Sequence, residues 1–288
     1  MAKFILSGFA DEADKNLDGQ IVALMKAGID FVEMRGVDGS SLIDCSDEKV
    51  LEIKEKLDKN NIKLSAVGSY IGKIQITDAF EPHLEKFKRA VEIAKMLGTK
   101  KIRIFSFYMP KGENPSSYLD EVIARLKAFL DAAEGSGVDC CLENEKDLYG
   151  DTPERMMDLF EALGPRLKGI FDPANYLQSG VKDTVAAFKK LLPYTDYMHI
   201  KDAKIKDGHV VPAGMGDGKI SELIQMFSQV EGERFLSIEP HLKVFDGFQN
   251  LGDDSSIKEE FVFESGTEAF LAAANALKVI LNNQGGKF

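Results

Sequence analysis

Four side chains that could bind one metal ion follow short apolar runs in the second half of the sequence. Glu143, Asp172 and Glu239 are carboxylates, and His199 is an imidazole. The first two intervals between them are about 30 residues, the length of one strand–helix unit. The third interval is about 40 residues, the length of such a unit with an insertion. This oxygen-rich, anionic set favours one six-coordinate divalent ion, Mn²⁺ or Mg²⁺, over a tetrahedral structural Zn²⁺, although Co²⁺ or Zn²⁺ could still bind.

Such a ligand set suits chemistry on a small sugar. Four protein ligands in an octahedron leave about two positions, which adjacent oxygens of a hydroxy-ketone or hydroxy-aldehyde could occupy together. The ion would polarise the carbonyl and stabilise an enediolate, and a carboxylate on each side of the bound carbons could move protons. The residues therefore predict a sugar isomerase or epimerase. A sugar lyase or dehydratase and a non-catalytic sugar-binding barrel remain as alternatives.

Short runs rich in β-branched and aromatic residues alternate with stretches in which apolar positions have helical spacing. The predicted strands cover residues 4–9, 31–35, 63–69, 101–107, 139–143, 167–172, 196–201 and 234–239. The predicted helices cover residues 16–27, 47–60, 82–97, 117–136, 153–163, 181–192, 219–230 and 264–282. Eight alternations without a linker predict one α/β domain over residues 1–288, a single (β/α)₈ TIM barrel, with a doubly wound sheet as the alternative.

Two insertions interrupt this alternation. Residues 203–219, with a glycine-rich stretch at 213–218, and residues 241–263 predict extended loops after strands seven and eight. Loops that follow barrel strands lie on the catalytic face, so both are candidate walls or lids of the site. The four candidate ligands end the last four strands, where polar side chains of a barrel converge above the apolar layers.

Composition excludes several classes of protein. The 288 residues include 36 Lys plus Arg and 47 Asp plus Glu, a net charge of −11, which argues against a nucleic-acid partner. The cysteines, Cys45, Cys140 and Cys141, cannot form a disulfide framework and are expected to be reduced. No apolar run approaches the roughly 20 residues of a membrane helix, and the first residues turn acidic too soon for a signal peptide. We expect a cytoplasmic protein with a small-molecule sugar substrate and no membrane partner, and leave homo-oligomer formation open.

The ordered motifs around these ligands extend over nearly the whole chain. They are LEN at 142–144, DPAN at 172–175, HIKD at 199–202, G-x-G-x-G at 214–218 and IE at 238–239. In this set the sequence resembles the xylose isomerase-like barrels of the sugar phosphate isomerase and epimerase family. The resemblance implies that Glu143, Asp172, His199 and Glu239 bind the metal. It also implies that Glu143 and Glu239 are the catalytic pair that transfers protons.

Two differences between this sequence and known relatives bear on its function. Ketose 3-epimerases of this group usually carry a histidine where Asn175 stands, and a second glutamate that contacts the sugar, for which Glu145 is the candidate here. Endonuclease IV, a DNA-repair relative, needs a histidine-rich site for three zinc ions, whereas this chain has four histidines in all. The DNA-repair function is therefore disfavoured.

Further polar residues are candidate substrate ligands, each with a structural alternative. Lys201 could bind a substrate oxygen or pair with a ligand carboxylate, and His241 could contact substrate or support the site. Asn175 could orient substrate or cap a turn. Arg35 could clamp an anionic group or pair with Glu33 or Asp38. The full set of substrate-binding candidates is Arg35, Lys73, Glu145, Asn175, Lys201 and His241. The glycine-rich stretch could cradle a phosphate or only shape the turn into the next helix.

Overall fold

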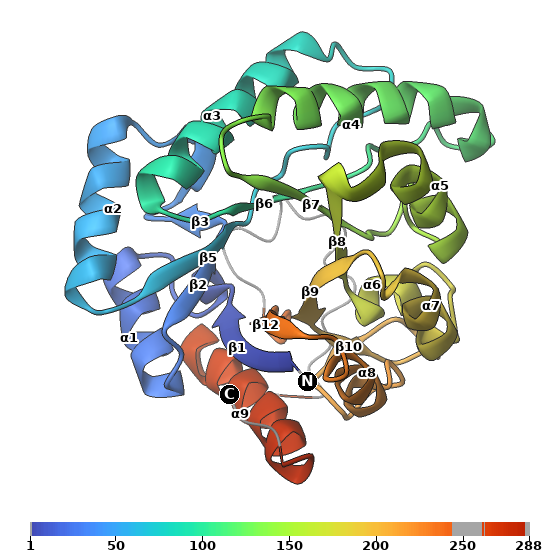
Figure 1. The fold of residues 1–288 in the computed structure, drawn as a ribbon. Coiled ribbons are helices and arrows are strands. Elements are labelled where there is room, and N and C mark those ends of the chain that lie inside the picture. The colour runs from blue at the N-terminus through green and yellow to red at the C-terminus, as the bar shows by residue number, and fades with distance from the viewer. Residues whose placement is uncertain (1, 244–260, 262, 286–288) are drawn as a thin grey trace.

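Eight parallel strands form a nearly closed barrel at the centre of the protein (Figure 1). The structure is a computed structural model and describes residues 2–243, 261 and 263–285. The hydrogen-bonded order is β1-β12-β9-β8-β7-β6-β5-β2, and β1 lies against β2 where the barrel closes. The barrel strands are β1 (Ala2–Gly8), β2 (Phe31–Met34), β5 (Lys63–Val67), β6 (Lys101–Ile104), β7 (Asp139–Glu143), β8 (Leu167–Phe171), β9 (Thr195–Ile200) and β12 (Gly232–Ile238).

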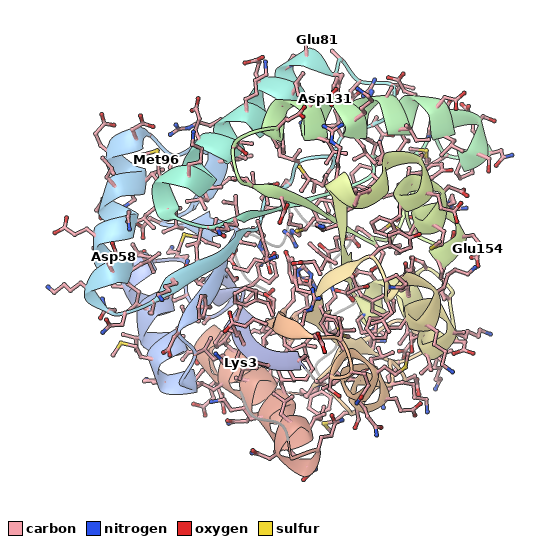
Figure 2. All side chains as sticks on the ribbon, in the orientation of Figure 1. Lys3, Asp58, Glu81, Met96, Asp131 and Glu154 are labelled. Carbon is pink, nitrogen blue, oxygen red and sulfur yellow. The ribbon has the colours of Figure 1, made fainter. Side chains whose placement is uncertain are left out.

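Helices surround this barrel and cover its outer face (Figure 1). The main ones are α1 (Leu17–Ala27), α2 (Asp47–Lys59), α3 (Glu81–Leu97), α4 (Leu119–Ala133), α5 (Pro153–Leu163), α7 (Thr184–Leu191), α8 (Ile220–Phe227) and α9 (Gly266–Asn283). The TIM-barrel prediction is thus confirmed. Figure 2 shows charged side chains such as Asp58, Glu81, Asp131 and Glu154 at the outer edge, and a second group of polar side chains inside the ring of strands. No described helix has both the length and the apolar character needed to cross a membrane.

Local chemistry explains where the helices begin and end. Ser46 and Thr152 accept hydrogen bonds from the N–H groups of Lys49 and Arg155, so α2 and α5 begin at capping side chains. Gly28 and Gly98 end α1 and α3 with φ of 60° and 76°, a left-handed conformation that costs glycine little. These caps fix the lengths of the helices and hence the positions of the strands that follow.

Short elements between the main ones were not predicted. They are the hairpin strands β3 (Gly36–Val37) and β4 (Ser40–Ser41), the helix α6 (Pro173–Gln178), and the 3-10 helices η1 (Ala10–Glu12), η2 (Leu42–Asp44), η3 (Pro115–Tyr118) and η4 (Gly164–Arg166). Helix α6 begins directly after Asp172, whose side chain accepts a hydrogen bond from the N–H of Asn175. An aspartate followed by proline is a signal for a helix start, so α6 was recognisable in principle.

The glycine-rich loop after β9 is closed around an internal carboxylate. Asp202 accepts hydrogen bonds from the N–H groups of Gly214, Gly216, Gly218 and Ala203 at 2.8–3.0 Å. A Cβ atom at Gly216 or Gly218 would lie 2.2 or 2.7 Å from Asp202 Oδ1, so these two glycines permit the close approach. The backbone donors that could have bound a phosphate are already occupied, and the phosphate-cradle interpretation is wrong.

The two predicted loops differ in what the structure shows. The first loop contains a two-stranded hairpin of β10 (Asp202–Ala203) and β11 (Val210–Val211). Residues 244–260 and 262 of the second lie outside the described residues. All three cysteines are buried and free, and Cys140 and Cys141 belong to β7.

Candidate active site and metal centre

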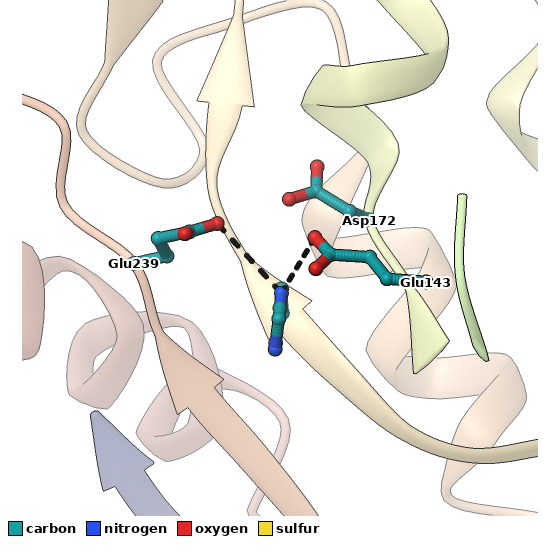
Figure 3. A group of neighbouring side chains, drawn as sticks. Glu143, Asp172 and Glu239 are labelled. Atoms are coloured by element: carbon teal, nitrogen blue, oxygen red, sulfur yellow. Dashed lines mark hydrogen bonds and ion pairs between the residues drawn. The ribbon is translucent and has the colours of Figure 1, made fainter. Parts of the chain in front are cut away.

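Four side chains from four neighbouring strands meet at one end of the barrel. Glu143 ends β7, Asp172 follows β8, His199 lies in β9 and Glu239 follows β12. All four are buried, and one potential ligand atom from each lies within 4.8 Å of the others. Figure 3 shows Glu239 on one side of the cluster and Glu143 with Asp172 on the other. The four ligands that the sequence predicts lie close together, because neighbouring parallel strands end at the same edge of the sheet.

The ring of His199 is held from both nitrogens. Its Nδ1 lies 2.9 Å from Glu143 Oε1 and 3.7 Å from Glu239 Oε2, the two contacts dashed in Figure 3. Its Nε2 lies 3.2 Å from Glu33 Oε2. The Nδ1 atom therefore faces the carboxylate cluster, and Nε2 faces away from it.

The three carboxyl groups of the cluster are in different electrostatic environments. Burial raises the pKa of Asp172 to about 7, against the opposing effect of the Lys201 ammonium. Burial acts in the same direction on Glu239, but nearby cations, Lys201 foremost, hold the pKa of Glu239 well below its usual value. Burial also raises the pKa of Glu143, but the charges of His199 and Arg103 together outweigh it and lower that pKa. The two glutamates are therefore ionised and can act as ligands or proton acceptors.

The donor set fits a divalent cation. Asp172 Oδ1 accepts the hydrogen bond that caps α6, whereas Oδ2 is buried and makes no well-oriented hydrogen bond to any described residue. The ammonium of Lys201 is 3.0 Å from that oxygen. The separations of up to 4.8 Å within the cluster are close to the roughly 4 Å that separates opposite ligands of a small divalent ion. The buried cluster could thus hold a metal through Glu143, Asp172, His199 Nδ1 and Glu239.

Two buried cations bridge the ligand carboxylates. Lys201 Nζ lies 3.0 Å from Asp172 Oδ2 and 2.8 Å from Glu239 Oε2. Arg103 Nη1 lies 3.1 Å from Glu143 Oε2 and 3.6 Å from Glu239 Oε1. Buried charges are stabilised by such pairing, and the contacts hold the carboxylates in place. Of the two interpretations of Lys201, the structure shows the ion pair.

Arg35 is anchored by carboxylates of the first barrel connection. It binds Asp11 with two nitrogens, at 2.9 and 3.0 Å, and contacts Glu12 Oε1 at 3.2 Å and Glu239 Oε1 at 3.3 Å. The predicted structural pairs with Glu33 or Asp38 are not those that form. Arg35 therefore links the end of β2 to η1 and to one of the candidate ligands.

Phe9 provides a flat surface beneath these charges. Its buried ring lies 4.7 Å from the guanidinium carbon of Arg35 and 4.8 Å from that of Arg103. It also meets the ring of His199 edge to face, with centroids 5.2 Å apart and an angle of 86°. Such contacts favour one orientation of each charged group.

A second group of potential ligands adjoins the first. Glu12, Glu239 and His241 bring ligand atoms within 4.8 Å of one another, and all three are buried. The guanidinium of Arg35 already contacts both carboxylates, at 3.2 and 3.3 Å. His241 Nε2 lies 3.4 Å from Glu12 and 3.5 Å from Glu239, and the backbone N–H of His241 donates to Glu12 Oε2 at 2.7 Å. We therefore interpret this group as an ion-pair network balanced by Arg35.

The other predicted substrate residues lie around the cluster. Lys73 Nζ pairs with Glu145 Oε2 at 2.8 Å and lies 4.5 Å from the ring centre of Phe105. Asn175 donates hydrogen bonds from its side chain to Glu143 Oε1 at 3.1 Å and to the carbonyl of Asn144 at 3.0 Å. Asn175 therefore supports a candidate ligand through its side chain and also lies in the capped first turn of α6.

Comparison with known proteins identifies the family of this barrel. The sequence profile of one family, described as xylose isomerase-like TIM barrel, matches residues 21–256. The chain belongs to this family. A relative from Bacillus subtilis (strain 168), the uncharacterized protein YfiH, is 25% identical over 183 residues, which are 56% of this chain and 58% of that protein. The chain therefore matches less than two thirds of the length of this relative.

Three solved structures share the xylose isomerase-like fold at low sequence identity. The IolI protein, described with a bound zinc atom, has a TM-score of 0.74 and 17% identity over 97% of this chain and 98% of its own. D-psicose 3-epimerase from Clostridium cellulolyticum H10 has a TM-score of 0.72 and 15% identity over 96% and 98%. The probable 3-DHS dehydratase AsbF from Bacillus anthracis has a TM-score of 0.71 and 16% identity over 96% and 99%. These likenesses establish the fold of the barrel.

Three buried residues of the candidate site were not predicted from the sequence. Arg103 lies between two isoleucines of β6, Ile102 and Ile104, and a charged residue between buried apolar neighbours signals a buried partner. Glu33 was considered only as a partner of Arg35, yet it contacts His199. Glu12 lies in η1, whose sequence gave no chemical signal. Burial raises the pKa of Glu12 to about 8, although Arg35 opposes the shift.

Metal binding at this site is expected to strengthen as pH rises. Burial lowers the pKa of His199, but the carboxylates of Glu143 and Glu33 outweigh it and raise that pKa well above the usual value. The metal-free imidazole therefore carries a proton that must leave before Nδ1 can bind an ion. Below the folded-state pKa, the affinity should rise about tenfold per pH unit for each proton released.

The measurement is calorimetric titration of Mn²⁺ between pH 6 and 8, in buffers of different ionisation enthalpy. We expect the observed enthalpy to depend on the buffer, which reports the released proton. An affinity and an enthalpy that are unchanged across these conditions would contradict the prediction.

Proposed function

We propose that this protein is a divalent-metal-dependent isomerase or epimerase of a small sugar or sugar derivative, free or phosphorylated. The observation that carries the proposal is the placement of Glu143 and Glu239. Their carboxylates approach His199 Nδ1 from two sides, at 2.9 and 3.7 Å, within one buried cluster. Two ionised carboxylates about one small site can remove a proton from one face of a carbon and return a proton from the other.

Glu143, Asp172, His199 and Glu239 would hold the ion, with Mn²⁺ or Mg²⁺ preferred for the oxygen-rich set and Co²⁺ or Zn²⁺ as substitutes. When bound, the ion would polarise the substrate carbonyl and stabilise an enediolate. Burial of all four side chains excludes water and strengthens each electrostatic contact in the site.

The chain's own residues would divide the remaining work. Glu143 is the proposed base, and its carboxylate is positioned by Arg103 and Asn175. Glu239 is the proposed acid: after its carboxylate has taken up a proton, it would donate that proton to the substrate. The ion pair with Lys201 holds the Glu239 carboxylate in place. Arg103 contacts both glutamates, so it would stabilise the negative charge on whichever of them is ionised.

Substrate hydroxyl groups would contact the polar side chains around the cluster. The Lys73–Glu145 pair supplies both a donor and an acceptor, and the Lys73 and Glu145 side chains are 4% and 17% exposed. Arg35, Asn175, Lys201 and His241 contribute further polar atoms, although each also contacts a neighbouring protein group. A sugar could therefore be bound by polar groups that are already oriented.

The test is incubation of the Mn²⁺-loaded protein with a panel of ketoses and aldoses in deuterated water. We expect isomer interconversion with deuterium incorporated at the carbon that changes configuration or oxidation level. Interconversion without solvent deuterium would indicate hydride transfer, and a product lighter by one water would indicate a dehydratase; either result would contradict the proposal. Binding of every sugar without turnover would do the same.

A further inference from the structure

A carboxylate and a phenol support His199 on the side away from the candidate metal. Tyr197 O–H donates to Glu33 Oε1 at 2.9 Å, and Glu33 Oε2 lies 3.2 Å from His199 Nε2. Glu33 and His199 are fully buried, and Tyr197 is 1% exposed. The chain of contacts runs across the barrel interior, from β9 to β2 and back to β9.

The backbone of the barrel is irregular at both supporting residues. The register between β2 and β5 shifts between Val32 and Glu33. The register between β8 and β9 shifts between Gly169 and Ile170, and Ile170 is paired with Tyr197. Such irregularities change the direction of a side chain relative to regular alternation. Both supporting side chains therefore emerge next to a local departure from regular pairing.

We propose that Glu33, held by Tyr197, is a positioning residue that fixes the tautomer and orientation of His199 so that Nδ1 binds the metal. A carboxylate acceptor at Nε2 keeps the ring hydrogen on that nitrogen and leaves the Nδ1 lone pair for an ion, and it increases the basicity of the ligand. The edge contact with Phe9 restricts rotation of the same ring. The inference rests on the proposed metal site but needs no particular reaction.

The test measures binding of Co²⁺, whose visible absorption reports the geometry of its ligands. Glu33→Ala should weaken Co²⁺ binding by about 10- to 100-fold and change the absorption spectrum. Glu33→Gln, which retains an acceptor oxygen, should weaken it less. Tyr197→Phe removes one oxygen atom and should weaken binding by a smaller factor than Glu33→Ala.

The matched control is Tyr176→Phe, which removes a buried hydroxyl that has no hydrogen-bond partner among the described residues. Its Co²⁺ affinity should equal that of the wild type. A folded Glu33→Ala variant that binds Co²⁺ within twofold of the wild type would overturn the inference. If Glu33→Ala does not fold, the comparison of Tyr197→Phe with Tyr176→Phe decides: a selective loss supports the inference, and equal affinities overturn it.

The outcome is distinguishable from failure of the proposed function. A wild type that binds Co²⁺ but converts no sugar would overturn the proposed reaction and leave the role of Glu33 to be decided by the variants. A wild type that does not bind Co²⁺ would overturn the metal site and the inference together.

Discussion

Glu239→Gln is expected to reduce turnover by about a thousandfold or more, because it removes a proposed metal ligand and a proposed proton carrier together. The Glu239 carboxylate also forms ion pairs with Arg35, Arg103 and Lys201. The neutral amide would direct N–H donors at some of these cations, so the loss extends to the local ion pairs. The measurement is the steady-state rate together with the Mn²⁺ affinity, after circular dichroism has shown that the variant is folded.

Excess metal distinguishes the two roles. If Glu239 acted only as a ligand, saturating Mn²⁺ would restore the rate, whereas loss of the proton carrier would persist. The matched control is Glu154→Gln on α5, whose carboxylate pairs with Lys190 at the surface. This control should retain wild-type turnover and affinity. Wild-type turnover in Glu239→Gln would contradict the proposed roles.

Asp202→Ala is expected to destabilise the protein by roughly 3 kcal/mol or more. The buried carboxylate accepts four backbone N–H bonds, and alanine would leave these donors without their acceptor. Asp217→Ala is the matched control in the same loop, because among the described residues the Asp217 side chain accepts one exposed bond, from Ile205 N–H. It should cost no more than about 1 kcal/mol. Equal effects of the two variants in denaturant unfolding would contradict the role assigned to Asp202.

The fold was predictable because barrel strands and helices have different apolar periodicities. Asp139–Glu143 and Pro153–Leu163 have the predicted bounds, since each is limited by clear local signals such as the cap at Thr152. Strand β6 ends at Ile104, three residues before the predicted end, and Phe107 has a φ of 70°. An apolar residue near the end of a strand gives the same sequence pattern whether it pairs within the sheet or lies in the turn that follows.

The site was predictable to the extent that it depends on strand ends. Glu143 ends an apolar strand and His199 lies one residue before the end of another, and parallel strands bring such ends together. The position of Arg103 signals only that it has a buried partner, whereas the identity of the partners of Arg103 and Glu33 depends on pairing across the barrel and on register shifts, which no local pattern predicts. The phosphate interpretation of the glycine-rich loop failed for a similar reason, since the backbone donors are taken by Asp202.

The most direct test of the account is a crystal structure of the protein grown with Mn²⁺ and measured for anomalous scattering. We predict one peak at about 2.0–2.3 Å from carboxylate oxygens of Glu143, Asp172 and Glu239 and from Nδ1 of His199. His199 Nε2 should remain against Glu33. A peak bound instead by Glu12, Glu239 and His241, or no peak at the four proposed ligands, would contradict the account.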